Sequence, residues 1–177
     1  MAAYEWLLAQ GIPAGSVCFM GDSAGGGLAL ATMLAARDRG FDLPAGAAVM
    51  SPWTDLSCSG PSFVTNLGRE ALAPRGSWTV FAKHALGGAD PRAPSVSPLF
   101  ADLRGLPPLL IHVGGDEVMR ADSTDFAARA QAAGMDVRLH VGPGLFHCYP
   151  VCAPMFPEAK AAMDDICAFA AAIPRRR

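Results

Sequence analysis

Long apolar runs, a marked excess of charge and paired cysteines are all lacking in this sequence. No apolar stretch approaches the ~20 residues that a membrane-spanning helix needs. The first residues, Met1 to Gln10, carry no basic region followed by an apolar core of the kind that signal peptides have. Lys and Arg total 14 and Asp and Glu total 16, so the net charge is only −2. This gives no reason to expect nucleic acid or an anionic membrane as a partner. We therefore expect a cytoplasmic protein.

The cysteines form an odd, scattered set with no Cys-x-x-Cys pair. They are Cys18, Cys58, Cys148, Cys152 and Cys167. Such a set fits reduced thiols better than a disulfide framework or a zinc site, and each cysteine is expected to be a small buried hydrophobe. Cys148 is the exception to watch because it neighbours His147. The sequence predicts no metal site and no cofactor.

Apolar residues, by contrast, are abundant. Hydrophobic residues make up 51% of the chain and charged residues 17%, so much of the chain has to be buried. A length of 177 residues is enough for one domain with its own core and short for two. We expect residues 1–177 to form a single domain.

A glycine-rich turn around Ser23 dominates the first part of the chain. The stretch from Phe19 to Gly27 reads FMGDSAGGG. It follows an apolar run, Ser16 to Met20, that predicts a short buried strand, and it precedes a segment, Leu28 to Arg39, with the spacing of a helix. Ser23 therefore lies on a turn from strand to helix.

Such a turn predicts a nucleophilic serine. A serine held in a strained backbone conformation there has its hydroxyl lifted clear of the sheet, and the residues two before and two after it are pressed together. Gly21 and Gly25 occupy those two positions, where we expect only glycine to fit. The alternative is a glycine-rich loop that binds phosphate at a helix start. No Lys follows the glycines, which excludes a Walker loop.

Strands and helices alternate along the rest of the chain. The further strands are predicted at Ala45 to Met50, Leu109 to Val113 and Val137 to Val141, and the helices at Ala2 to Gln10, about Ala24 to Arg39, Ser77 to Leu86, Ser123 to Ala133 and Pro157 to Ala172. This order predicts an α/β fold with a mostly parallel sheet of about four strands and right-handed crossovers. Alternating polarity predicts that the last strand lies at an exposed edge.

The segment 56–94 interrupts this alternation. It is rich in Ser, Gly and Pro with scattered aromatics, and an insertion at the carboxyl edge of a parallel sheet commonly forms part of a lid or pocket. We expect Phe63, Trp78 and Phe81 either to line an apolar cleft or to pack in the core.

A serine nucleophile needs a base, and His147 is the best candidate. His84 lies in a predicted helix, and His112 and His140 lie inside predicted strands. His147 alone lies on a loop just past the carboxyl end of a strand, where open parallel sheets place their sites. The alternative for His147 is an ordinary surface histidine.

The base in turn needs an orienting acid, for which Asp116 is the candidate. Asp116 directly follows a predicted strand at the same sheet edge, whereas the adjacent Glu117 is expected to point elsewhere. Asp122 and Asp125 fit a helix start, and Asp122 is expected to be a cap or a support of the site. The chain order of serine, aspartate and histidine is that of the α/β-hydrolases.

Several motifs resemble those of bacterial esterases of the hormone-sensitive lipase family. They are Gly21 to Gly26 (GDSAGG), Ser51 to Leu56 (SPWTDL), Ser97 to Leu99 (SPL), Leu106 to Pro108 (LPP) and Gly115 to Glu117 (GDE). The resemblance covers almost the whole chain. It implies an α/β-hydrolase fold and hydrolysis of short or medium carboxylic esters through an acyl-enzyme, with Ser23 as nucleophile, Asp116 as acid and His147 as base.

The sequence also departs from this family. The family carries a His-Gly-Gly-Gly segment upstream of the serine turn that contributes to the oxyanion hole, and this sequence has none. The Ala24 N–H is then the remaining oxyanion donor, and we expect weak activity because losing one such donor costs ~10²- to 10³-fold in rate.

The chain therefore resembles the carboxyl-terminal portion of a hydrolase, a partial α/β-hydrolase domain. Its first strand would have an open edge, which favours a homo-oligomer or pairing with an upstream fragment. Two alternatives to an esterase remain: a silent fragment that acts as a binding or oligomerising module, and an amidase or acyltransferase of the same fold.

Overall fold

The protein is built on a parallel four-stranded sheet, here described from a computed structural model that covers residues 1–72 and 76–172. The strands lie in chain order: β1 (Cys18–Asp22), β2 (Gly46–Met50), β3 (Leu109–Gly114) and β4 (Val137–Gly142). Each pairs in parallel with the next, so that Met20 lies beside Ala48 and Ala48 beside Leu110. The predicted α/β fold with a parallel sheet is confirmed.

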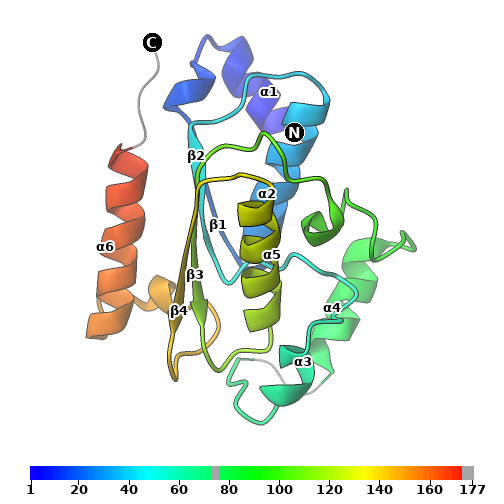
Figure 1. Cartoon of the computed structure of the whole chain (residues 1–177), viewed down its shortest axis with the longest axis vertical. Helices are drawn as coiled ribbons and strands as arrows, with labels where there is room; N and C mark the ends of the chain where they lie inside the picture. The colour runs from blue at the N-terminus through cyan, green and yellow to red at the C-terminus, as the bar shows by residue number, and fades with distance from the viewer. Residues whose placement is uncertain (73–75, 173–177) are drawn as a thin grey trace.

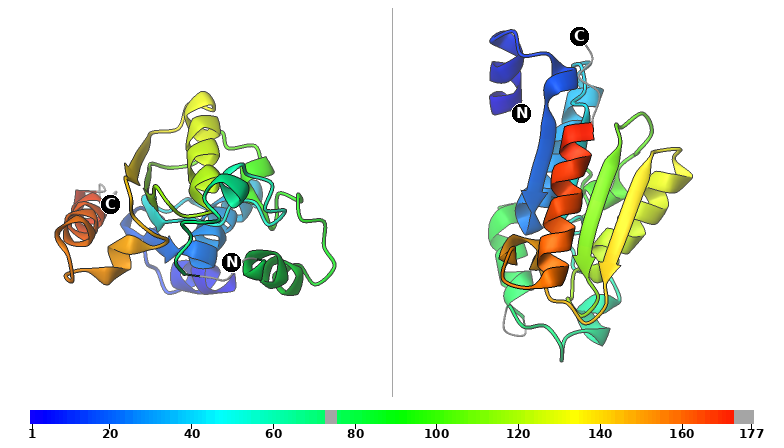
Figure 2. Two further views of the ribbon diagram at one scale, coloured as in Figure 1. Left: turned by 90° about the horizontal axis from the view of Figure 1, so that it is seen from below. Right: turned by 90° about the vertical axis from the view of Figure 1, so that its left-hand side faces the viewer.

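Helices cover both faces of this sheet (Figure 1). One face carries α2 (Ser23–Asp38) and α5 (Arg120–Ala132), and the other carries α6 (Pro157–Ala172) (Figure 2). Side chains alternate between the two faces along each strand. Val49 and Ile111 therefore pack with Phe126 on the first face, while Leu110 packs with Ile166 on the second.

The amino-terminal segment packs at the end of the sheet where the strands begin (Figure 1). It contains α1 (Ala2–Ala9) and a 3₁₀ turn, η1 (Ala14–Ser16). Tyr4 is buried there, packs edge-on against Phe19 and donates its hydroxyl hydrogen to the carbonyl oxygen of Asp42. Among the described residues, no helix combines the length and apolar character required to cross a membrane.

The edges of the sheet differ in exposure. β4 alternates between half-buried and exposed residues, which confirms the predicted edge strand. β1 forms the other edge of the described sheet, paired on one side with β2, and its Met20 is half exposed. That another strand binds along this edge stays a prediction.

Element boundaries move by a few residues from those expected. β1 begins at Cys18 rather than Ser16 because residues 14–16 form the η1 turn. α5 begins at Arg120, three residues before the predicted Ser123. The earlier start places Asp122 in the first turn of the helix, where a carboxylate is favoured.

The described residues of segment 56–94 contain the predicted helix α4 (Ser77–Leu86) and a one-turn helix, α3 (Ser62–Thr65), that the sequence pattern does not predict. They lie toward the end of the sheet where the strands finish, with α3 below the strand ends and α4 beside them (Figure 1). Trp78 of α4 packs against Trp53 and Val118, so the segment has an apolar contact with the body of the domain. Two 3₁₀ turns complete the chain, η2 (Pro98–Phe100) and η3 (Tyr149–Cys152).

The glycines of the serine turn are crowded in a different pattern from the one expected. A Cβ on Gly21 would lie 2.4 Å from the Gly25 carbonyl oxygen, whereas a Cβ on Gly25 would meet only the Asp22 carboxylate at 3.9 Å. The expectation that only glycine fits at position 25 is therefore wrong, because a Cβ there would not clash with its neighbours. Gly27 is as crowded as Gly21, since its Cβ would lie 2.1 Å from the backbone oxygen of Trp53, and a Cβ on Gly26 would lie 3.0 Å from Pro52.

We predict that Gly27→Ala destabilises the protein and that Gly25→Ala does not. Alanine at Gly27 would force α2 away from the Trp53 backbone, and overpacking of this kind costs about 1–3 kcal/mol. Alanine at Gly25 makes only an ordinary contact with the Asp22 carboxylate and gains up to about 1 kcal/mol of helix propensity. Urea denaturation of the two variants measures the difference, and equal free energies of unfolding would contradict this packing.

Candidate active site

Ser23 lies where β1 passes directly into α2. Its φ angle is +51°, a left-handed conformation that costs a non-glycine residue about 1–3 kcal/mol. The Ser23 carbonyl oxygen accepts a hydrogen bond from the Trp53 N–H, which holds the turn in place. The strained turn predicted around Ser23 is confirmed.

His147 reaches Ser23 from the loop that follows β4. Its Nε2 lies 2.9 Å from the Ser23 Oγ, and its ring packs 5.2 Å from that of Trp78. The loop passes close to β3 at Gly114. A Cβ on Gly114 would lie only 2.4 Å from the Leu145 carbonyl oxygen, so glycine allows this approach. The structure thus brings together two of the three residues that the sequence proposes.

The carboxylate that contacts His147 is Glu117, and the predicted contact with Asp116 is wrong. Glu117 Oε1 lies 3.1 Å from His147 Nδ1, and the Glu117 side chain is fully buried. Asp116 is turned outward and lies 3.4 Å from the Arg69 guanidinium, with its side chain 32% exposed.

The reason for this difference lies in the backbone after β3. The Gly115 N–H donates to the Gly142 carbonyl oxygen and the Asp116 N–H to that of Leu145, so both residues continue along the β4 loop. The chain turns inward one residue later, at Glu117. Nothing in the local sequence distinguishes two adjacent carboxylates that follow a strand, so only the path of this loop identifies the partner.

Ser51 is a further site residue that sequence reasoning missed. Its hydroxyl donates to Glu117 Oε2 at 2.8 Å and accepts a hydrogen bond from the Cys148 N–H at 2.9 Å. Glu117 Oε2 also accepts from the Gly114 N–H at 2.8 Å. Ser51 is fully buried and has φ +46°. Ser51 therefore links the Glu117 carboxylate to the loop that carries His147.

Helix α3 and the residues after it hold the Glu117 loop from outside. Asn66 Nδ2 donates to the carbonyl oxygens of Gly115 and Glu117 at 3.0 and 2.9 Å. Ser62 donates to the Val118 carbonyl oxygen. Both side chains are buried. Residues 62–66 of segment 56–94 therefore support the site from outside.

Asp122 holds the backbone of the loop after β2, in agreement with the expectation that it supports the site. Its Oδ2 accepts hydrogen bonds from the N–H groups of Thr54 and Asp55 at 2.9 and 2.8 Å, while its Oδ1 is buried without a partner. Burial is the main reason that the pKa of Asp122 is raised to about 8, although the two N–H groups act in the opposite direction.

The pKa of His147 is raised above its ordinary value. Burial of the ring opposes protonation most strongly, but the Cys148 side chain and the hydrogen bond and negative charge of Glu117 together outweigh it. Glu117 therefore makes His147 a stronger base toward the Ser23 hydroxyl.

A cavity of about 700 Å³ opens above Ser23 and His147. Its apolar lining comes from Trp53, Leu72, Trp78, Phe81, Phe146 and Val151. The sequence predicts that Phe63, Trp78 and Phe81 either line a cleft or pack in the core. Trp78 and Phe81 line the cleft, whereas Phe63 packs in the cluster of Trp53 and Trp78. Ala24, at the first turn of α2, also lines the cavity.

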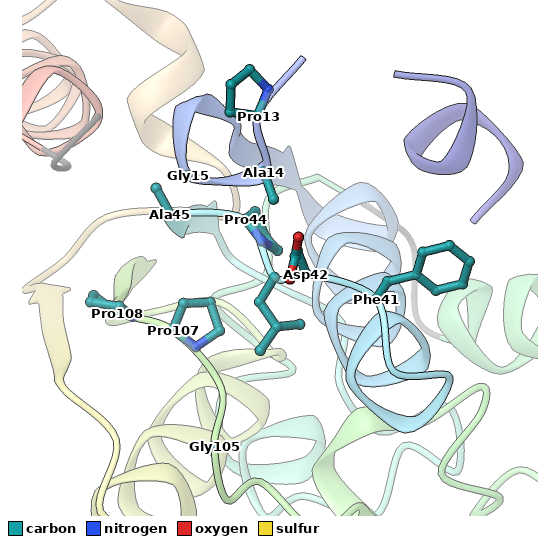
Figure 3. A pocket seen from close by; sticks show the side chains of 11 residues that line it. Pro13, Ala14, Gly15, Phe41, Asp42, Pro44, Ala45, Gly105, Pro107 and Pro108 are labelled. Carbon is teal, nitrogen blue, oxygen red and sulfur yellow. The ribbon is translucent and has the colours of Figure 1, made fainter. Parts of the chain in front are cut away.

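A second cavity of about 750 Å³ lies at the opposite end of the sheet, where the strands begin (Figure 3). Prolines such as Pro44 and Pro107 form much of its wall. Asp42 is the one ionisable side chain among its lining residues, all of which the structure describes. This cavity contains no nucleophile and base in contact, in contrast to the site around Ser23.

The chain belongs to a family of proteins with the alpha/beta hydrolase fold, whose model matches residues 1–151. It is 44% identical to an acetyl-hydrolase of Streptomyces hygroscopicus and 37% identical to an esterase of Acinetobacter venetianus, in each case over 96% of this chain and 56% of the relative. The chain thus spans about half the length of these curated relatives.

Solved structures give the same result. An esterase of the bacterial hormone-sensitive lipase family superposes with a TM-score of 0.92 and 43% identity, over 96% of this chain and 57% of that one. A hormone-sensitive lipase from a metagenome library gives a TM-score of 0.93 and 38% identity, over 97% and 58%. The likeness to the hormone-sensitive lipase family inferred from the motifs is confirmed.

We predict that Asp122→Asn changes the pH dependence of stability. A carboxyl whose pKa is about 8 when folded and about 3.9 when unfolded stabilises the fold fully below pH 4, and this contribution is lost as the pH rises through about 8. Asparagine keeps an oxygen for the two N–H groups but does not ionise.

The free energy of unfolding of Asp122→Asn, relative to the unchanged protein, should therefore rise between pH 5 and pH 8 by up to about 1.4 kcal/mol per pH unit. Urea denaturation at several pH values measures this difference. A difference that stays constant with pH would show that Asp122 is ionised in the fold.

Proposed function

We propose that this chain carries the catalytic centre of a serine carboxylesterase that hydrolyses esters of short and medium acyl chains. The observation that carries the proposal is the continuous contact from the Ser23 Oγ through His147 to Glu117, beside an apolar cavity. The relatives named as an acetyl-hydrolase and an esterase support it. Glu117 takes the role that the sequence assigned to Asp116.

The hydrogen bonds define a consistent proton arrangement. Glu117 is held by two other donors at Oε2, so its Oε1 accepts from His147 Nδ1–H. His147 Nε2 then has a free lone pair and accepts from the Ser23 hydroxyl. This is the tautomer that a general base requires.

In the proposed first half-reaction, the Ser23 Oγ attacks the carbonyl carbon of the ester and its proton passes to His147 Nε2. The tetrahedral oxyanion faces the Ala24 N–H at the amino end of α2, where the helix dipole favours negative charge. The carbon–oxygen bond to the alcohol then breaks, and the alcohol leaves with the proton from His147. Ser23 keeps the acyl group as an ester.

In the second half-reaction, His147 takes a proton from a water molecule whose oxygen attacks the acyl carbon. The Ser23 Oγ leaves and recovers its proton from His147, and the carboxylic acid is released. Glu117 stabilises the imidazolium in both halves without changing its own protonation.

The proposed substrate range follows from the cavity. Aromatic rings of Trp53, Trp78 and Phe81 line a volume of about 700 Å³, a size within the range of small-molecule sites. Because Trp78 and Phe81 belong to α4, we propose that this part of segment 56–94 acts as a lid that shields the acyl group from water.

The proposal predicts that a fluorophosphonate probe labels the protein at Ser23. Ser23→Ala should abolish labelling, and His147→Ala should reduce its rate at least ~10²-fold, since a positioned base contributes about 10²- to 10⁴-fold. Turnover of p-nitrophenyl acetate and butyrate should fall in parallel.

The matched controls are Ser16→Ala, on the η1 turn, and His84→Ala, on the exposed face of α4; both should behave as the unchanged protein. Folding of each variant is checked by circular dichroism. If the unchanged protein is folded but is neither labelled nor active, the esterase proposal is wrong. That result would favour a catalytically silent fragment that acts as a binding module.

A further inference from the structure

A polar cluster lies on the α6 face of the sheet, apart from the site around Ser23. His112 of β3 and His140 of β4 are register partners in adjacent strands. Their imidazole rings stack with centroids 4.7 Å apart and planes 12° from parallel. Asp165 of α6 faces both rings across the gap between helix and sheet.

The three side chains have the spacing of metal ligands. Asp165 Oδ2 lies 2.9 Å from His112 Nε2 and 3.5 Å from His140 Nε2, and all three atoms lie within 4.8 Å of one another. In a tetrahedral zinc site with bonds of about 2.0–2.1 Å, neighbouring ligand atoms are roughly 3.3 Å apart. His112 Nε2 and Asp165 Oδ2 already lie within this distance, whereas the His140 ring has to turn out of its stack on His112 so that its Nε2 lone pair points to the same ion.

The surroundings of the cluster suit a bound cation. The His112 Nδ1 lies 3.2 Å from the Tyr149 hydroxyl. The hydroxyl oxygen can accept a hydrogen bond from Nδ1–H and so leave the Nε2 lone pair free for a metal, as outer partners of ligating histidines do.

Solvent access to the cluster and nearby charges also affect the binding of a cation. The His140 and Asp165 side chains are 52% and 32% exposed, so solvent reaches the cluster and can supply a fourth ligand. One group opposes a cation: the Arg138 guanidinium lies 3.8 Å from Asp165 Oδ1, although it is half exposed and packs over the Phe169 ring.

We propose that His112, His140 and Asp165 form a binding site for a divalent transition metal ion, with Zn²⁺ as the best match to two imidazoles and one carboxylate. The ion links α6 to β3 and β4. This site is independent of the proposed esterase chemistry. The sequence predicts no metal here, because the ligands come from three separate elements and show no local spacing.

The test is titration of the untagged protein with Zn²⁺ by isothermal calorimetry, and with Co²⁺ by visible absorption. We expect one ion per chain, an increase in Tm with Zn²⁺, and Co²⁺ bands typical of tetrahedral coordination. His140→Gln and Asp165→Asn should each weaken binding at least ~10-fold, while Arg138→Gln should strengthen it because a repelling charge is removed.

Three controls separate this site from other ligands. His84→Gln, Cys167→Ser and His147→Ala should leave Zn²⁺ affinity unchanged, since they remove an exposed histidine, an exposed thiol on α6 and the proposed catalytic base. Absence of Zn²⁺ binding by the folded protein, or binding that both His140→Gln and Asp165→Asn leave unchanged, would overturn the proposal. The cluster would then be a hydrogen-bonded contact that fastens α6 to the sheet.

Discussion

The contact between His147 Nδ1 and the buried Glu117 carboxylate is the interaction around which this end of the molecule is arranged. A fully buried carboxylate has to be satisfied by hydrogen bonds, and here the donors are the Ser51 hydroxyl, the Gly114 N–H and the His147 ring. These donors come from the ends of β2 and β3 and from the loop after β4. Satisfying one charge thus fixes three loops relative to one another.

The same constraint explains why the loops are supported from behind. Asn66 holds the backbone of the Glu117 loop, and Asp122 holds the backbone of the loop that follows Ser51. On the other side, α2 fixes Ser23 because Gly27 allows the helix to touch the Trp53 backbone. Ser23 and His147 are therefore positioned by rigid elements, as the proposed chemistry requires.

The sequence was sufficient for the fold and for two of the three contacting residues. Apolar runs located β1, β2 and β3, alternating polarity located β4, and the GDSAG motif identified Ser23, because the signal of that turn is local. His147 followed from its place after a strand.

The features that the sequence did not predict depend on contacts between residues that are far apart in the chain. Glu117 differs from Asp116 only through the hydrogen bonds of the loop with residues 142 and 145, and Ser51 acts through partners that are 66 and 97 residues away. The one-turn helix α3 is too short for any period to reveal it. The cluster of His112, His140 and Asp165 likewise exists only once β3, β4 and α6 are assembled.

A comparison of Glu117→Gln with Asp116→Asn shows which of the two adjacent carboxylates orients His147. The measurement is the second-order rate constant for inactivation by a fluorophosphonate, as a function of pH. Glu117→Gln should lower this rate by about 10²- to 10⁴-fold, and its remaining reactivity should extend to lower pH, because the charge that raises the pKa of His147 is gone. Asp116→Asn should stay within about twofold of the unchanged protein, as expected for an exposed pair with arginine. Loss of as much reactivity in Asp116→Asn as in Glu117→Gln, or a Glu117→Gln protein that reacts at the rate of the unchanged protein, would show that Glu117 does not orient His147.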